Sequence, residues 1–235
     1  WWAGGGAAQG GWEVLRQITI ACEAWLDRIP TIVELPYPLP LVAVVLGVDL
    51  AAYWLHRLCH TRRALWLLLH RPHHMTPHLA MPVTMPVYAA APLFLLFAIP
   101  FQLLMGASTK LFAAEPMILE ALLLRVVCHT LGIYSHCEVY YTWTRRVRPV
   151  RWLSAFYGVA SYHYMHHSAR PGHEAINLGN WFFMLWDRVF DTYVAPTEER
   201  PPTGLTGQPR LHSNPLRLAL AGILQLAHEL RHNRG

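Results

Sequence analysis

The feature that most constrains this chain is an apolar run from Leu39 to Leu58, broken only by Asp49 and by the start of a histidine pair. A helix of this length rises about 30 Å, which matches the hydrocarbon thickness of a bilayer. Hydrophobic residues make up 54% of the chain and charged residues 14%, whereas roughly 25% of a soluble domain is charged. The sequence therefore predicts an integral membrane protein of one domain, or at most two.

Two further apolar segments are predicted to cross the membrane, from about Val83 to Met105 and from about Pro116 to Ser135. Together they would form a hairpin that returns the chain to the side it left. Several prolines in the first of these segments predict kinks. We expect residues 39–193 to form the membrane-embedded functional region.

The two ends of the chain are predicted to lie along the membrane rather than across it. Residues 1–11 are too rich in glycine to favour a helix, and residues 12–29 have the pattern of an amphipathic surface helix that closes before Pro30. Residues 1–38 are thus an expected interfacial segment. Residues 194–235 are an expected linker followed by an amphipathic helix from Asn214 to about His232.

Basic residues predict the orientation. The chain carries 19 Lys and Arg residues, and Lys110 is the single lysine. The arginines that follow the first and third spans fall on one side and Lys110 on the other, so the arginine side is predicted to be cytoplasmic. The membrane would be the bacterial inner membrane, or the endoplasmic reticulum in a eukaryote, with the histidine-rich segments on its cytoplasmic side. No nucleic-acid-binding motif is present, so nucleic acid is not an expected partner.

Three histidine clusters stand out among the 15 histidines. His56 and His60 are four residues apart, so on a helix both imidazoles project from one face. His70-Arg71-Pro72-His73-His74 and His163-Tyr164-Met165-His166-His167 share the spacing His-x-x-His-His. Neutral imidazole is the commonest ligand for zinc, iron and copper in proteins. Eight clustered imidazoles exceed what one ion accepts, so the sequence predicts two metal ions.

A polar stripe leads from the first span into the first histidine pair. Asp49, Tyr53, His56 and His60 follow at steps of four, three and four, so they share a helical face. A carboxylate inside a membrane span is a candidate functional group, and Asp49 is expected to accept a hydrogen bond that orients a histidine. The alternative is a carboxylate paired with an arginine for packing alone.

These motifs together resemble the fatty acid hydroxylase / sterol desaturase superfamily of membrane di-iron oxygenases, over roughly residues 45–232. The likeness rests on the segment from Asp49 to His60, the two His-x-x-His-His motifs, a histidine after the third span, and the tail Asn177-x-Gly followed by Trp186-Asp-Arg-x-Phe-x-Thr. It implies an all-α membrane bundle whose cytoplasmic, histidine-rich helical cap holds a dinuclear metal site.

The resemblance also implies the site residues. The implied metal ligands, which would also be the catalytic residues, are His56, His60, His70, His73, His74, His136, His163, His166 and His167. Residues expected to support them are Asp49, Tyr53, His129, Glu138, His173, Asn177 and Asp187. His78 is a reserve ligand, and His212, His228 and His232 are expected to be surface residues.

The chain departs from the family pattern at three positions. Glu138 stands where the family often has an asparagine after the histidine corresponding to His136, so Glu138 is expected to bind metal or hydrogen-bond there. Leu178 replaces a common tyrosine, and Asp191 a common glycine. These last two changes leave the implied metal site intact and leave the substrate open.

The implied reaction uses two ferrous ions and O2 to attack an unactivated C–H bond of a lipid-type substrate. Hydroxylation gives an alcohol, whereas loss of a second hydrogen gives an alkene. Electrons must come from outside, since no dinucleotide, haem or iron–sulfur motif is present. A ferredoxin or cytochrome b5-type donor could be steered by the arginines of residues 145–151, although this run could also contact lipid headgroups.

Two other classes share histidine-rich motifs. A membrane metal transporter would place its ligands near the middle of the membrane, whereas these histidines lie mostly beyond the span ends. A membrane zinc hydrolase could use the same ligand set, and the sequence alone leaves it open.

Overall fold

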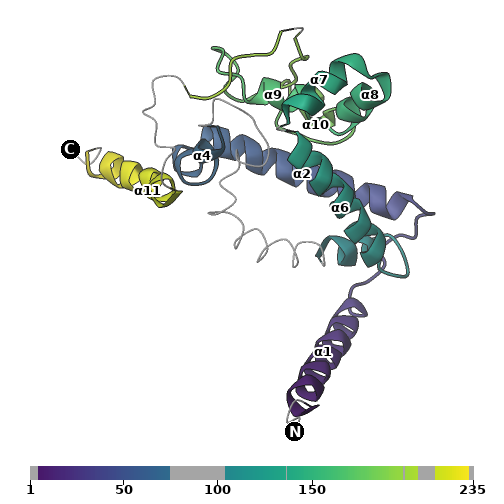
Figure 1. Ribbon diagram of the computed structural model, residues 1–235. Coiled ribbons are helices and arrows are strands. Elements are labelled where there is room, and N and C mark those ends of the chain that lie inside the picture. Colours follow the sequence, from purple (N-terminus) through teal and green to yellow (C-terminus); the bar gives the residue numbers. More distant parts are fainter. Residues whose placement is uncertain (1–4, 75–103, 136, 198, 206–214, 233–235) are drawn as a thin grey trace. The chain divides into compact units, whose positions relative to one another are not determined.

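The structure is a computed structural model of the 235-residue chain, and it describes every residue except 1–4, 75–103, 136, 198, 206–214 and 233–235 (Figure 1). In the described residues all regular elements are helical, and one isolated bridge joins Ser168 and Thr203. The prediction of an all-α fold is confirmed for this part of the chain. Two compact units are present: Trp1–Val45 with Pro100–Leu124, and Leu46–Ile99 with Arg125–Gly235.

The first unit begins with helix α1, Gly5–Leu26. The expectation that residues 1–11 are not helical is therefore wrong from Gly5 onward. Extending an existing helix costs much less than nucleating one, so the helix that starts at Trp12 can continue back through Ala7 and Ala8. Its apolar side chains are largely exposed, with Trp12 73% and Trp25 46% accessible. This exposure fits the amphipathic pattern of the sequence.

A short 3-10 helix, η2 (Thr109–Leu111), organises the rest of the first unit. The Ile32 amide donates to the Leu111 carbonyl at 2.9 Å, and the Thr31 hydroxyl donates to Ala113 at 3.1 Å. Thr109 is buried, and its hydroxyl accepts the Met117 amide at 2.8 Å. The segment after α1 is thus tied to the turn that the sequence predicted between two spans.

Helix α2, Leu39–Thr61, contains the apolar run from Leu39 to Leu58. Among the described residues it is the one helix long and apolar enough to cross a membrane, with a mean hydropathy of 1.7. Helix α6, Ile118–Tyr134, matches the third predicted apolar segment. The second, Val83–Met105, lies almost entirely outside the described residues, so the multi-pass topology stays a prediction.

In the second unit, α2 is followed by three short helical pieces: α3 (Arg63–Leu65), the π-helix η1 (Trp66–His70) and α4 (Arg71–His74). The C-terminal helix α11, Pro215–His232, packs against η1. Gly222 allows this approach, since a Cβ there would lie 2.2 Å from the Leu67 carbonyl oxygen. An ion pair at 2.7 Å between Arg63 of α3 and Glu229 of α11 stabilises the packing of α11 on this segment. The predicted C-terminal helix is confirmed.

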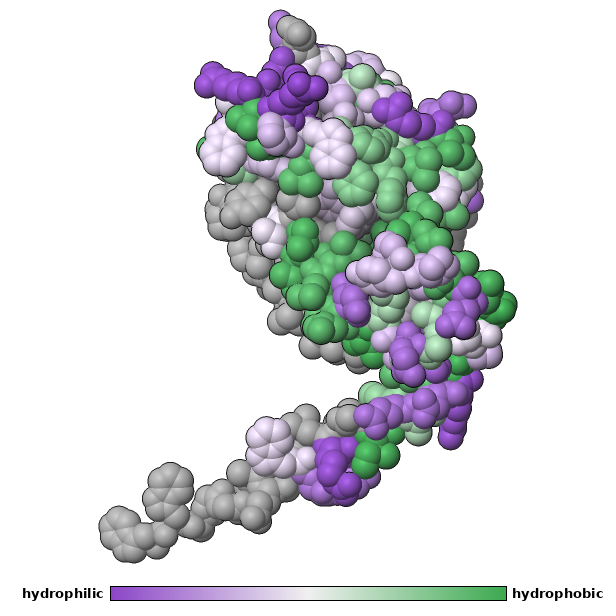
Figure 2. Space-filling model, turned by 90° about the vertical axis from the view of Figure 1, so that its right-hand side faces the viewer, coloured by the Kyte–Doolittle hydropathy of each residue, from purple (hydrophilic) through white to green (hydrophobic). Residues whose placement is uncertain are grey.

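The remaining helices of this unit are α7 (Glu138–Arg146), α8 (Arg148–Phe156), α9 (Ser161–His166) and α10 (Leu185–Val189). Helices α7 and α8 are joined at Val147 and form a hairpin, and α8 contacts α9. Within this unit, the region of α7 and α8 in Figure 1 carries many hydrophilic side chains in Figure 2. Four arginines of this hairpin are exposed: Arg145, Arg146, Arg148 and Arg151.

Candidate metal centre

Three helical segments bring the histidine clusters together. His56 and His60 lie at the end of α2, with ring centroids 5.3 Å apart as their spacing predicts. The second cluster comes from η1 and α4, and the third from α9 with the residue that follows it. Eight of the nine predicted ligands meet in this way: His56, His60, His70, His73, His74, His163, His166 and His167. The ninth, His136, lies outside the described residues.

The eight side chains form three groups. Within each group, the ligand atoms lie within 4.8 Å of one another. These are His56, His60, His70 and His166; then His73, His163 and His167; then His74, His166 and His167. The first two groups share no residue, and the third connects them. The arrangement fits two ions side by side better than one.

The repeated His-x-x-His-His spacing has a geometric consequence in this fold. The first histidine lies three and four residues before the other two, so all three project from one broad helical face, while the two adjacent histidines point in directions about 100° apart. In α9 and the residue after it, His163 and His167 belong to the second group and His166 to the first, while His166 and His167 meet His74 in the third. In the earlier motif His73 joins the α9 pair, whereas His70 joins His166. Each motif therefore contributes to both groups.

Nε2 atoms converge at the middle of the cluster. The distances between Nε2 atoms are 2.9 Å for His56 and His70, 3.0 Å for His74 and His70, and 3.0 Å for His74 and His166. In the second group the His167 Nε2 atom lies 2.9 Å from that of His73 and 3.0 Å from that of His163. One ring N–H cannot donate to two such neighbours at once.

A loop supplies acceptors for the outer nitrogens of these rings. We call Glu174–Leu178 the carbonyl strap, because carbonyls of alternate residues face three histidines. His56 Nδ1 lies 2.7 Å from the Leu178 oxygen and His166 Nδ1 lies 2.9 Å from that of Ile176. The His60 ring contacts the backbone carbonyl of Glu174.

The strap determines which ring nitrogen carries the proton. A carbonyl only accepts, so Nδ1 of His56 and of His166 must donate, which leaves a lone pair on each Nε2. The Nε2 atom of His60 is buried and has no hydrogen-bond partner among the described residues. Buried lone pairs that face one another are unfavourable unless a cation lies between them. The residues present therefore fit a metal centre.

Burial keeps the inner imidazoles neutral. It lowers the pKa of His74, His166 and His167 well below the usual value, and neighbouring histidines lower each pKa further. Burial also lowers the pKa of His70. Neutral imidazole is the form that binds metal, so the cluster needs no deprotonation step near neutral pH.

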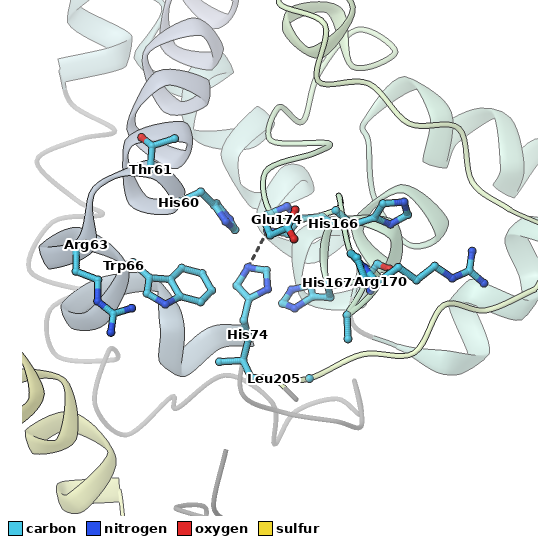
Figure 3. Close-up of a pocket in the computed structure, with 15 residues that line it drawn as sticks. His60, Thr61, Arg63, Trp66, His74, His166, His167, Arg170, Glu174 and Leu205 are labelled. Atoms are coloured by element: carbon cyan, nitrogen blue, oxygen red, sulfur yellow. Dashed lines mark hydrogen bonds between the residues drawn. The ribbon is translucent and has the colours of Figure 1, made fainter. Parts of the chain in front are cut away.

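A cavity of about 550 Å³ opens beside the cluster (Figure 3). His60, His74 and His167 reach it from different segments, and Trp66 lies against the first two, with ring centroids 5.3 and 5.4 Å away. The wall is mixed, with an apolar part and a charged rim. The lining residues are His60, Thr61, Arg63, Trp66, His74, His166, His167, Ser168, Ala169, Arg170, Pro171, His173, Glu174, Gly204 and Leu205.

The predicted supporting residues fall into two sets. Asn177, within the carbonyl strap, and Asp187, beside it, are both buried. The Asn177 side-chain amide donates to the carbonyls of Tyr162 and Val194, and its oxygen accepts the Val194 amide. The Tyr53 hydroxyl contacts that of Thr192 at 3.0 Å. These residues fix the loop rather than the rings.

The other supporting residues lie elsewhere. Asp49, which was expected to orient a histidine, is buried next to the backbone of Asn180 and Trp181 instead. Glu138 is exposed and pairs with Arg200 at 2.7 Å, and in the described residues no contact joins it to the cluster. His173 lines the cavity. The side chain of His129 is not described, and His78 and His212 lie outside the described residues, whereas His228 and His232 are exposed as expected.

Sequence reasoning missed the carbonyl strap and Trp66. The strap acts through its backbone, so side-chain identity carries almost no signal for it. The sequence held one signal, the residue types at two loop positions: Asn177 and Asp191 adopt positive φ values of 51° and 55°. Asparagine, aspartate and glycine are the residues that adopt such values most readily, which also explains a common glycine at the Asp191 position.

The model of the fatty acid hydroxylase family matches residues 41–192. The chain therefore belongs to the fatty acid hydroxylase family, as the histidine motifs predicted. This membership implies a membrane-associated oxidoreductase of the oxygenase or desaturase type, in a family known for iron-dependent hydroxylases. No solved structure matches the chain.

Proposed function

We propose that the protein is a membrane-bound di-iron oxygenase that uses O2 and external electrons to hydroxylate an unactivated C–H bond of a lipid-type substrate. The observation that carries this proposal is the convergence of eight imidazoles, seven of which have Nε2 atoms 2.9–3.0 Å from a neighbouring Nε2 atom, in a chain of this family. Histidine-rich centres with open positions suit iron that must also accept O2.

One ion would be held by His56, His60, His70 and His166, and the other by His73, His163 and His167. His74 lies between the two groups, and we propose His136 as a ninth ligand. Bound ferrous ions would supply the redox chemistry that activates O2. The protein's own contribution is to hold neutral rings in fixed tautomers, so that lone pairs rather than N–H groups face the centre.

Hydroxylation consumes one O2, two electrons and two protons. It inserts one oxygen atom into a C–H bond and releases the other as water. Desaturation has the same inputs, removes two hydrogen atoms from neighbouring carbons, and releases two waters. Which outcome occurs depends on how the substrate chain is held. We propose hydroxylation, with desaturation as the alternative, and we propose the cavity beside Trp66 as the route to the centre.

The electrons would come from a ferredoxin or cytochrome b5-type protein. The exposed arginines of α7 and α8 support this assignment, because a cluster of one charge steers an acidic partner. Attraction of the same arginines to anionic lipid headgroups is the competing outcome. We further propose several membrane spans with the metal centre on the cytoplasmic side, because the arginine-rich segments flank the histidine motifs.

The most direct test of the reaction is mass spectrometry of lipids from cells that make the wild-type protein or the His163→Ala variant. A lipid that gains one oxygen only with the wild type would support hydroxylation. A lipid that instead loses two hydrogens would identify a desaturase. Identical lipid profiles, together with O2 uptake that reductant and lipid do not stimulate, would contradict an oxygenase and point to a zinc hydrolase or a transporter.

A further inference from the structure

Asp187 is the most completely engaged carboxylate in the described residues. It lies on α10 with no exposed surface. Its Oδ1 accepts the Leu178 amide and the Thr192 hydroxyl, each at 2.7 Å, and its Oδ2 accepts the Gly179 amide at 2.7 Å. Asp187 touches none of the eight converging histidines directly in these hydrogen bonds.

One peptide group nevertheless joins Asp187 to the cluster. The Leu178–Gly179 peptide donates its N–H to Asp187 Oδ2, and the carbonyl of the same peptide accepts the His56 Nδ1 proton at 2.7 Å. A peptide is a planar, resonance-stabilised unit, so negative charge at its N–H end increases electron density on its oxygen. Hydrogen bonds in series strengthen one another by this polarisation.

We propose that Asp187 is a positioning residue that tunes the His56 side of the metal centre through the Leu178–Gly179 peptide. The arrangement corresponds to a carboxylate–histidine–metal triad with a peptide inserted between the carboxylate and the ring. This inference rests on the proposed function, since it needs a metal at Nε2 of His56. It assigns to a buried aspartate 131 residues away in sequence a role that a direct carboxylate contact normally has.

The surroundings of Asp187 require a carboxylate at this position. Arg57 donates to the Tyr53 hydroxyl at 2.9 Å. Tyr53 is therefore free to donate to Thr192, which donates to Asp187. Every neighbour of the carboxylate thus offers a proton. An asparagine would turn an NH2 group toward one of these donors, which leaves a buried donor without a partner.

Gly179 is the companion of this contact. A Cβ at that position would lie 2.8 Å from Asp187 Oδ2 and 3.7 Å from Tyr53 Cδ2. The carboxylate oxygen can meet the amide at 2.7 Å because no side chain intervenes. Gly179→Ala should therefore push Asp187 away while keeping its charge, which gives a second, independent perturbation of the same link.

The test is a Co²⁺ titration of the metal-free, full-length protein in detergent, followed by the visible absorption of the bound ion. Asp187→Asn should weaken Co²⁺ binding by about 10-fold or more, the usual effect of removing a hydrogen-bonding partner of a ligand histidine, and should shift the absorption bands. Asp191→Asn is the matched control, because Asp191 is exposed in the same loop and asparagine tolerates its positive φ.

A purely structural role predicts something different. Asp187→Asn would then lower the melting temperature of the metal-free protein, but the folded fraction would bind Co²⁺ with wild-type affinity and spectrum, and this result would overturn the proposal. If Asp187→Asn does not fold, Gly179→Ala decides, with weaker binding in support and wild-type binding against. A wild-type protein that binds no Co²⁺ would instead refute the metal centre itself.

Discussion

The Nε2 atom of His73 lies 2.9 Å from the Nε2 atom of His167, although 94 positions separate the two residues. Only a folded arrangement of α4 against α9 can produce this contact. Each His-x-x-His-His motif thus supplies a histidine to a group that contains histidines of the other motif. Loss of one ligand should therefore disturb the metal centre and not only the helix that carries it.

The first prediction concerns these ligands. His73→Ala and His163→Ala should each reduce turnover by more than about 100-fold, because loss of a metal ligand costs more than loss of its hydrogen-bonding partner. His228→Ala is the matched control, since His228 is exposed on α11. Turnover can be followed as O2 uptake that depends on reductant and lipid. Wild-type rates in either of the first two variants would remove that residue from the centre.

The second prediction concerns pH. The folded protein holds His74, His166 and His167 with lowered pKa values, whereas the unfolded chain titrates them near about 6.5. The unfolded state therefore binds more protons as the pH falls below about 6.5, and the free energy of unfolding of the metal-free protein should fall with it. One pH unit below that value costs about 1.4 kcal/mol for each such histidine.

Thermal melting of the metal-free protein at about pH 7.5 and about pH 5.5 measures this effect, since these values bracket the ordinary histidine pKa. The melting temperature should be clearly lower at the acidic value. His228→Gln should show the same difference, because this exposed residue is not part of the cluster. An equal melting temperature at both values would mean that the cluster is not buried as a set of neutral rings.

The third prediction concerns the contact between α11 and η1. Gly222→Ala places a Cβ against the Leu67 carbonyl, where 2.2 Å is available, so α11 must shift or separate and stability should fall by about 1–3 kcal/mol. Gly47→Ala is the control, because in the part of the chain that the structure describes nothing lies within 4 Å of its Cβ position on α2. Hydrogen exchange of the α11 amides should increase only in the first variant. Unchanged exchange there would show that α11 does not rest on η1.

The fourth prediction concerns the electron donor. Reversing charge with Arg145→Glu, Arg148→Glu and Arg151→Glu together should raise the donor concentration needed for half-maximal turnover by about 10-fold at low salt. The effect should shrink at high salt, as screening removes it from the wild type as well. Arg231→Glu, on the exposed end of α11, should change nothing. Equal donor dependence in all variants would assign these arginines to lipid headgroups.

The sequence predicted the parts of this protein that depend on periodic patterns. The apolar run gave α2, the spacing of His56 and His60 placed both on one helical face, and the shared motif indicated two metals. Family membership agrees with the resemblance drawn from those motifs. The sequence overstated the effect of glycine at the start of α1, because propensity is a local quantity and helix extension is cooperative.

What the sequence could not predict depends on backbone atoms and on contacts distant in sequence. The carbonyl strap orients rings through peptide oxygens, which every residue has. Asp49 was expected to orient a histidine, but it lies beside the backbone of Asn180 and Trp181. The pairing of Glu138 with Arg200 depends on how the chain after α9 returns to α7, which a pattern of residues does not specify.

The central claim is tested most directly by counting metal ions. Protein purified without O2, or reconstituted from the metal-free form with Fe²⁺, should contain about two irons per chain, since the two separate ligand groups each accept one ion. His73→Ala and His56→Ala should each contain fewer. A wild-type protein that binds no iron, or only one ion that both variants retain, would contradict the account.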